Sequence, residues 1–263
     1  MKIRCNRIRK TSLFKKILCF DSLDSTSQKA KVLALAGIKA GAVVIAETQV
    51  KGRGRLGRSW ESPDGGIWFS AVFYPKKVTP EYIPVITLGA GIAVCRVIRK
   101  ACRVSATLKW PNDILIRNKK VCGILTEMIS TGDRNICIIG VGLNANVDMS
   151  QLSEELQEST TSLLNEMHKR VNREKLISRI LCKLNKYCRM INHRRWGRII
   201  KEWKQYSSTI GQPVEAHLEG STITGLAEGI SEKGSLMIRL GDGSLKEVAS
   251  GEVSLKNPEK ELK

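Results

Sequence analysis

Apolar and polar positions in the first hundred residues alternate between helical and extended spacing. Residues 24–41 open with side chains that favour helix N-caps, continue with apolar positions at helical spacing and stop at Gly41, which predicts a helix. The short apolar runs at 42–47 and 67–75 predict buried strands. Residues 82–102 are apolar nearly all round, which predicts a buried helix.

The middle of the chain is predicted to be extended. Three short β segments are expected at 106–111, 113–129 and 135–146, and the second of them should be a hairpin that turns at Asn118 and Lys119.

The last third combines a long helical segment with a run of short strands. Residues 172–206 have helical periodicity, an amphipathic pattern and many basic side chains. Between Ser208 and Gly211 the pattern changes to four or five short strands separated by glycine-rich turns. We therefore expect a large domain followed by a small β unit, of a size that suits a small barrel.

Charge narrows the range of partners. The 263-residue chain carries 44 Lys and Arg against 25 Asp and Glu, a formal net charge of +19. Such an excess favours anionic partners, namely nucleotides, nucleic acid or an acidic protein, and says nothing about the fold. The hydrophobic content of 42% is ordinary for a globular protein and argues against wholesale disorder.

The cysteines do not form a metal-binding pattern. None of the eight lies in a Cys-x-x-Cys pair, and the chain has three histidines. The basic N-terminus lacks the apolar segment of a signal peptide, and no run is long enough to span a membrane. We therefore expect reduced thiols in a cytoplasmic protein at Cys5, Cys19, Cys95, Cys102, Cys122, Cys137, Cys182 and Cys188.

The segment KGRGRLGRSW, residues 51–60, is the most unusual stretch. It places four cations among three glycines inside a predicted loop at 48–66. Guanidinium groups and glycine-freed backbone N–H groups both recognise phosphate and carboxylate, so an anion site is the favoured interpretation. A solvated or nucleic-acid-binding loop stays open as the alternative. The glycine spacing matches neither a P-loop nor a dinucleotide fingerprint.

Three further segments are candidates for binding. In LKWPND, residues 108–113, Pro111 fixes a turn directly after a strand, and Lys109 could bridge two anions. GVGLNAN, residues 140–146, permits close backbone approach, and DSLDSTSQ, residues 21–28, offers hydroxyls at a helix N-terminus. A surface lysine, an ordinary turn and a simple helix cap would explain the same three segments.

The order and spacing of these motifs resemble the biotin protein ligases, a family related in fold to the lipoate ligases. The resemblance covers roughly residues 14–255. It is carried by DSTSQ, ETQVKGRGRLGRSWESP, LKWPNDI, VCGILTE, GVGLNAN and the C-terminal GLAEGISEKGSLMIRL and VASGEVSL.

The resemblance implies an α+β fold. The expected catalytic domain is a mixed β-sheet with flanking helices, like class II synthetases, and the expected C-terminal unit is a small SH3-like β-barrel. The corresponding divisions are a biotin- and ATP-binding domain at 13–208 and the barrel at 211–258. The basic composition of residues 1–12 predicts a mobile arm before them.

The resemblance also implies a reaction. Biotin is activated with ATP and Mg²⁺ to biotinyl-5′-AMP, and the biotin is then passed to a lysine of a biotin carboxyl carrier domain. Lys109, Arg53 and Arg55 are the implied catalytic residues. The implied biotin contacts add Ser25, Thr26, Ser27, Gln49, Gly52, Gly54, Gly123 and Leu125, and the implied ATP contacts add Arg58, Trp60, Asn112 and Asn144. Asn112 and Asn144 could contact either ATP or Mg²⁺, and no residue is assigned to the metal alone.

Two positions depart from the family pattern. Ser27 stands where the family usually has Asn, and Cys122 stands beside the pocket glycine where small apolar residues are usual. About 13 residues precede the catalytic domain, too few for the winged helix-turn-helix of repressor members, so sequence-specific DNA binding is not expected. A homodimer is compatible with the resemblance, and no membrane partner is expected.

Two alternative functions stay open. A lipoate or octanoate ligase would keep the fold and change the acyl group, although the GRGRLGR and KWPND pair argues against it. A basic nucleic-acid-binding protein would use residues 1–16 and 192–204 as its surface and should bind in a salt-dependent, sequence-indifferent way.

Overall fold

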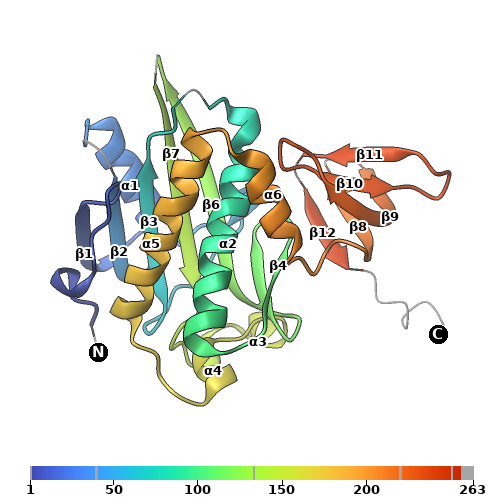
Figure 1. The fold of residues 1–263 in the computed structure, drawn as a ribbon. Helices are drawn as coiled ribbons and strands as arrows, with labels where there is room; N and C mark the ends of the chain where they lie inside the picture. The colour runs from blue at the N-terminus through green and yellow to red at the C-terminus, as the bar shows by residue number, and fades with distance from the viewer. Residues whose placement is uncertain are drawn as a thin grey trace.

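A β-sheet of seven strands and a second sheet of five strands organise the chain (Figure 1). The structure is a computed structural model, and it describes residues 2–38, 41–76, 78–132, 134–218, 221–249 and 251–255. The first sheet lies between two layers of helices, and the second sheet follows the last helix. The predicted α+β class with a small C-terminal β unit is therefore confirmed.

The seven-stranded sheet is mixed, with the order β1-β2-β3-β7-β6-β5-β4. Only β1 and β2 pair in parallel, because helix α1 connects them as a crossover; the other neighbours are antiparallel. Its strands are β1 (Lys16–Leu23), β2 (Ala42–Gln49), β3 (Ile67–Phe73), β4 (Ala106–Lys109), β5 (Asp113–Ile116), β6 (Lys119–Thr131) and β7 (Arg134–Leu143).

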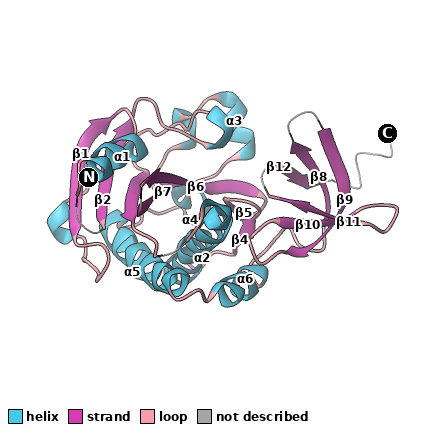
Figure 2. Cartoon of the chain, turned by 90° about the horizontal axis from the view of Figure 1, so that it is seen from above, coloured by secondary structure: helices cyan, strands magenta, loops and turns pink. Residues whose placement is uncertain are grey.

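Helices cover both faces of this sheet. Seen from above, α1 (Thr26–Leu35) and α3 (Glu154–Ser159) lie on one side, and α2 (Ile83–Cys102), α5 (Arg173–Asn192) and α6 (Trp196–Lys204) lie on the other (Figure 2). The short α4 (Leu163–Met167) follows α3. By length and apolar composition α2 could cross a membrane, but 72% of its most apolar stretch is buried inside the fold. Core packing therefore explains its apolarity.

The first helix ends earlier than its glycine pattern predicts. Ser25 caps the N-terminus by accepting a hydrogen bond from the backbone N–H of Gln28. At the other end Gly37, four residues before the predicted stop at Gly41, takes the left-handed conformation with φ of 81°. The N–H groups of Gly37 and Ile38 then close the last turn onto the carbonyls of Ala34 and Leu33, which ends the helix at Leu35.

Two other predicted boundaries are wrong by small amounts. The hairpin between β5 and β6 turns at Arg117 and Asn118, whose φ values are 49° and 63°, one residue earlier than predicted. The single helical segment predicted at 172–206 is divided into α5 and α6, because Arg194 adopts a left-handed backbone conformation between them. Strand β1 and the helices α3 and α4 were not predicted.

The C-terminal unit is an antiparallel sheet with the order β11-β10-β9-β8-β12. Its strands are β8 (Pro213–Leu218), β9 (Ser221–Ile230), β10 (Leu236–Arg239), β11 (Leu245–Val248) and β12 (Glu252–Leu255). Trp110 joins this unit to the first sheet, because its backbone N–H donates to Thr209 Oγ1 and its indole N–H donates to the carbonyl of Gly234. The domain limits at 208 and 211 stay a prediction, and the predicted end at residue 258 lies outside the described residues.

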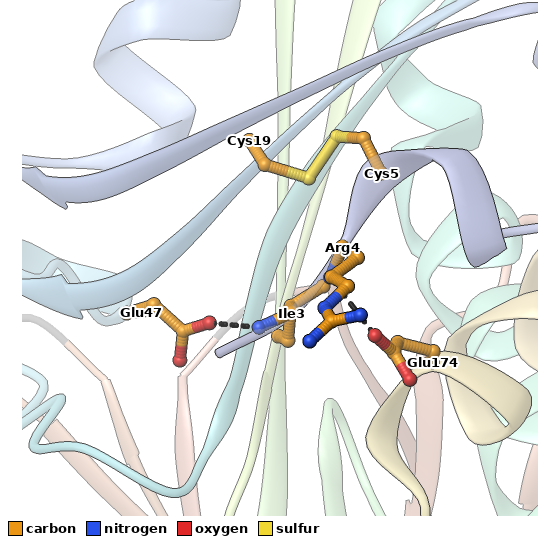
Figure 3. The surroundings of a disulfide bond; sticks show 6 residues. All are labelled: Ile3, Arg4, Cys5, Cys19, Glu47 and Glu174. Carbon is orange, nitrogen blue, oxygen red and sulfur yellow. Dashed lines mark hydrogen bonds between the residues drawn. A yellow bond between two sulfur atoms is a disulfide. The ribbon is translucent and has the colours of Figure 1, made fainter. Parts of the chain in front are cut away.

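The N-terminal segment packs on the first sheet and is not a mobile arm. Ile3, Ile8 and Phe14 are buried, and the N–H of Ile3 donates to the buried carboxylate of Glu47. Cys5 forms a disulfide with Cys19 of β1, so the prediction that all eight cysteines are reduced is wrong for this pair (Figure 3). The segment is held in place by these buried apolar residues, which lie between the cations. The prediction of a mobile arm considered only the charges.

We expect the Cys5–Cys19 disulfide to stabilise the fold, because it closes a loop of 14 residues in the unfolded chain. Cys5→Ser should lower the free energy of unfolding by about 3 kcal/mol under non-reducing conditions. Cys182→Ser, at an exposed free thiol, is the matched control. Thermal unfolding followed by circular dichroism measures both; equal midpoints for the two variants would contradict the expectation.

Candidate active site

One cavity, on the side of the sheet that α1 covers, gathers the segments singled out in the sequence. It encloses about 150 Å³. Its walls come from the N-terminus of α1, the 48–66 loop, the β4–β5 turn, parts of β6 and β7, and residues 251–253 at the start of β12. Segments separated by more than two hundred positions therefore meet at one place.

Hydroxyl and amide groups line one part of the cavity. Thr26 Oγ1 lies 2.9 Å from Ser70 Oγ, and Ser25 Oγ lies 3.0 Å from Ser27 Oγ. The backbone N–H of Thr26 donates to Gln49 Oε1 at 2.7 Å, and the Gln49 amide donates to Ser62 Oγ at 2.8 Å. These buried groups are fixed by one another, so they present a pre-arranged set of donors and acceptors.

Trp60 lies on a floor of two glycines. Gly123 of β6 and Gly142 of β7 are directly opposite in the sheet register. A Cβ atom at Gly123 would come within 2.8 Å of the indole, and one at Gly142 within 2.7 Å. Both positions must therefore lack a side chain if the ring is to rest there. The indole N–H is buried without a hydrogen-bond partner in the described structure, and Lys120 Nζ lies 5.1 Å from the ring centroid.

The loop between Gly52 and Trp60 folds back on itself. The N–H of Gly54 donates to the carbonyl of Arg58 at 2.8 Å, and the N–H of Trp60 donates to the carbonyl of Gly52 at 3.0 Å. Gly57, at φ of 75°, makes the tight turn. Trp60 at the loop's base thus positions the arginines above the cavity.

Two loop arginines reach the C-terminal unit. Arg55 Nη1 donates to the carbonyl of Gly251 at 3.2 Å and lies 3.4 Å from Asn112 Oδ1. Arg58 forms a two-pronged ion pair with Glu252. Burial lowers the pKa of Arg55, while the hydrogen bond with Glu252 raises the pKa of Arg58 and lowers that of Glu252. Both arginines stay charged at neutral pH.

Lys109 ends β4 and stands opposite Asp113 in the tight β4–β5 hairpin. Trp110 and Pro111 follow it, joined by a cis peptide bond, and Trp110 is buried. The Asp113 carboxylate pairs with Lys120 at 2.8 Å. Lys109 is therefore held on the cavity wall by a turn whose next residue is anchored in the core.

A second, larger groove opens beside the cavity. It encloses about 1000 Å³ and extends to α3 and β12. The two spaces share one wall, formed by Arg58, Ser59, Trp60, Lys109, Asp113, Lys120 and Glu252. The wall between the cavity and the groove thus carries more cationic than anionic side chains.

Most of the sequence-predicted site residues line the cavity. Two do not. Gly52 is buried beneath the loop, where a Cβ atom would lie 2.2 Å from the carbonyl oxygen of Trp60. Asn144 lines the larger groove and is 3% exposed, with its amide donating to the carbonyl of Thr161. The thirteen that line it are Ser25, Thr26, Ser27, Gln49, Arg53, Gly54, Arg55, Arg58, Trp60, Lys109, Asn112, Gly123 and Leu125.

Several lining residues were missed by sequence reasoning. Ser70 lies in a run of apolar residues that predicts only a buried strand, and Glu252 lies in the C-terminal unit. Lys120 follows the predicted hairpin turn, and Asp113 lies in the candidate segment LKWPND but was given no role. For Ser70 the sequence did contain a signal, because it is the one polar residue within the apolar run at 67–73.

Comparison with known proteins decides the family. Residues 19–144 match the biotin/lipoate A/B protein ligase family, and residues 209–256 match the biotin protein ligase C-terminal domain. The chain is 34% identical over 241 residues to the bifunctional ligase/repressor BirA of Bacillus subtilis, covering 91% of this chain and 74% of that protein. This chain belongs to the biotin protein ligases.

Two further biotin protein ligases support this assignment. The biotin–[acetyl-CoA-carboxylase] ligase of Mycobacterium tuberculosis is 32% identical over 86% of this chain and 85% of its own length. The structure of the biotin protein ligase from Aquifex aeolicus in complex with biotin and ATP is 30% identical and covers 93% of this chain and 100% of that one, with a TM-score of 0.79.

The departures from the biotin protein ligase pattern have structural explanations. Ser27 keeps a hydroxyl within hydrogen-bond distance of Ser25 and stays on the cavity wall. Cys122 is fully buried, away from the cavity lining, and burial raises the pKa of its thiol. It is therefore a core residue whose thiol stays protonated at neutral pH.

We expect Gly142→Ala to loosen the arginine loop, because the added methyl group would overlap the Trp60 indole. Overpacking of this kind costs about 1–3 kcal/mol, so the loop should open more often. Trypsin cleavage after Lys51, Arg53, Arg55 or Arg58, followed by mass spectrometry, should be faster than in the unmodified protein. Gly197→Ala, where a methyl group would meet nothing within 4 Å, is the control. Equal cleavage rates in both variants would contradict the role of the glycine floor.

Proposed function

We propose that this chain is an ATP-dependent biotin–protein ligase. A carboxylate oxygen of biotin attacks the α-phosphorus of ATP, pyrophosphate leaves, and biotinyl-5′-AMP forms. The amine of an acceptor lysine then attacks the biotinyl carbonyl, AMP leaves, and an amide bond results. The family of the chain and the solved relative that binds biotin and ATP support this reaction.

The position of Lys109 is the main observation behind the proposed mechanism. It lies on the wall that the small cavity and the large groove share. We assign the small cavity to biotin and the groove to ATP. Lys109 would then contact the biotin carboxylate and the α-phosphate together, at the point where the new bond forms.

Electrostatics explains why this wall needs several cations. Two unit negative charges about 4 Å apart repel by about 4 kcal/mol at an effective dielectric constant of 20. Arg53, Arg55, Arg58, Lys109 and Lys120 line the cavity, against the carboxylates of Asp113 and Glu252. The excess positive charge offsets the repulsion between the reactants, and the loop excludes water from the mixed anhydride.

The polar groups of the cavity support one proposed orientation of biotin. The hydroxyl and amide groups of Ser25, Thr26 and Gln49 suit the ureido ring, which has both donors and acceptors. Leu125 supplies apolar surface for the valeryl chain. The carboxylate would then point toward Arg53, Arg55 and Lys109.

The residues present fit an Mg²⁺ ion that arrives with the nucleotide. Among the described residues no group of three His, Cys, Asp or Glu side chains could hold a metal ion. Mg²⁺ typically takes one or two protein oxygens and several from phosphates and water. The candidate protein ligands are Asp113 of the shared wall and the amide of Asn112, which lines the small cavity beside it. When bound, the ion would shield the phosphate charges of ATP.

The acceptor is proposed to be the biotin carboxyl carrier domain of a biotin-dependent carboxylase, in the cytoplasm. Its lysine must reach the shared wall through the open groove. A homodimer remains a proposal, and β1, at one edge of the large sheet, is the strand available for it.

The acyl group is tested with purified protein, Mg-ATP and either biotin or lipoate. We expect mass spectrometry to detect biotinyl-AMP with biotin and little product with lipoate. Lipoyl-AMP as the main product would move the function to the lipoate ligases. Neither product from folded protein would refute the ligase assignment.

Lys109→Ala should lower biotinyl-AMP formation by a factor of about 10²–10³, which is typical for loss of one group that stabilises developing charge. The fold should be kept, because Lys109 is half-buried and carries charge rather than core packing. Single-turnover rates measure the loss, circular dichroism checks the fold, and Lys246→Ala, at an exposed lysine of β11, is the control. An unfolded Lys109→Ala protein would make Lys109 a structural residue instead.

Arg55→Gly should release biotinyl-AMP into solution, because Arg55 holds the loop to Gly251 and Asn112. The ratio of free to protein-bound biotinyl-AMP, measured after rapid filtration, should increase. Arg103→Gly replaces an exposed arginine outside the cavity and should leave the ratio unchanged. Equal retention by the Arg55→Gly variant and the unmodified protein would contradict the closure mechanism.

A further inference from the structure

The charge excess of the chain is concentrated in two segments that the active site does not use. Residues 2–20 contain seven Lys and Arg and no Asp or Glu. Residues 173–204 contain eleven Lys and Arg and two Glu. Neither segment lines the active-site cavity or the large groove beside it. Binding of biotin and ATP therefore leaves this charge unexplained.

The structure places the two segments side by side. Three side chains of α5 fix the N-terminal segment along the helix: Arg4 N–H donates to Glu174, Arg9 N–H to Ser178 Oγ and Leu13 N–H to Asn185 Oδ1. The Cys5–Cys19 disulfide holds the same segment to the sheet (Figure 3). The cations of the N-terminal segment thus stand in a fixed position beside those of α5.

The outward side of α5 carries a row of cations. Lys175, Arg179, Lys186 and Arg189 are exposed at helical spacing, and Arg7 and Arg9 share a surface hollow with the first two. Arg195 and Arg198 of the α6 region share a second hollow with the last two. The four cations of α5 span 14 residue steps of the helix, about 21 Å, and Arg195 and Arg198 extend the row beyond its C-terminal end.

Two carboxylates line the hollows beside this row, and both have other hydrogen-bond partners. Glu174 accepts the N–H of Arg4, and Glu202 is occupied by Arg96 and by the hydroxyl of Tyr187. In the part of the chain that the structure describes, none of the exposed α5 and α6 cations forms an ion pair. We call this surface the basic face: Arg7, Arg9, Lys175, Arg179, Lys186, Arg189, Arg195 and Arg198.

The basic face lies on the opposite side of the sheet from the active-site cavity. Helices α5 and α6 belong to the layer with α2, whereas the cavity opens beside α1 (Figure 2). An acidic carrier domain bound here would hold its lysine on the wrong side of the sheet. A second copy of the chain would be repelled by like charge.

The chemistry of the face favours a rigid polyanion. The exposed large hydrophobic residues of the described chain are Val32, Leu35, Val50, Leu56, Leu226 and Leu245, and all lie elsewhere, so the face has no apolar anchor for a lipid surface. Trp196 is half-buried and packs against Tyr82 at a tilted angle, so it is not a free aromatic platform for single-stranded bases. A straight row of guanidinium and ammonium groups matches the phosphates of a duplex.

We propose that the basic face binds duplex DNA through its phosphates, without sequence preference and independently of the ligase site. Contacts of this kind release counterions, so the affinity falls steeply with salt. The expected dissociation constant at physiological salt is about 10⁻⁴–10⁻⁶ M.

The test uses the full chain and a labelled DNA duplex of about 30 base pairs, titrated at several salt concentrations by fluorescence anisotropy. The variant Arg179→Glu, Lys186→Glu and Arg189→Glu should bind about tenfold more weakly or worse, and the slope of log affinity against log salt should fall by about 1 for each lost contact. The control Lys31→Glu, Lys119→Glu and Lys246→Glu has the same net charge but leaves the face intact.

Both triple variants should keep biotinyl-AMP formation, which also reports that they fold. If the glutamate variant is unfolded, the glutamine variant at the same three positions replaces it. Equal weakening in test and control variants would overturn the assignment, because it would make binding a property of total charge. Binding to anionic phosphatidylserine vesicles without DNA binding, a duplex RNA bound more than tenfold tighter, or no binding at all would overturn it as well.

Discussion

The packing of Trp60 on Gly123 and Gly142 is the constraint on which the site depends. The two glycines face each other on neighbouring strands and leave a flat area that admits the indole. Because the ring rests there, the loop before it must cross the mouth of the cavity. The guanidinium groups of Arg53, Arg55 and Arg58 are consequently held near Lys109, although like charges repel and glycine-rich backbone is costly to order.

The C-terminal unit takes part in this arrangement. Arg55 contacts the carbonyl of Gly251 and Arg58 pairs with Glu252, so the loop bridges the two sheets. Trp110 provides a second bridge directly beside Lys109. If Arg58 binds phosphate as proposed, the phosphate would compete with Glu252, and ligand binding would be coupled to the contact between the two units. The shared wall is thus assembled from both units, which explains why the ligase motifs and the C-terminal segment belong together.

The sequence allowed much of the fold and the site to be predicted, and the failures have physical causes. Strong periodicity located β2, β3, α2 and β7, and the family resemblance named thirteen of the residues that line the cavity. Strand β1 was missed because an edge strand that is half exposed has no clear alternation. Helix α1 ends earlier than predicted because Gly37, which comes before Gly41 in the chain, already takes the left-handed conformation that closes the helix. The Cys5–Cys19 disulfide, and Ser70 and Glu252 in the site, depend on tertiary proximity, which no local pattern reports.

The central claim is that Lys109 and the arginine loop meet the phosphate that joins biotin to AMP. A crystal structure with a non-hydrolysable biotinyl-AMP analogue tests it most directly. The account predicts Lys109 Nζ and at least one guanidinium of the loop within hydrogen-bond distance of the linker between biotin and adenosine, with Trp60 still on its two glycines. An analogue bound with its linker away from Lys109, or a loop detached from the glycine floor, would contradict the account.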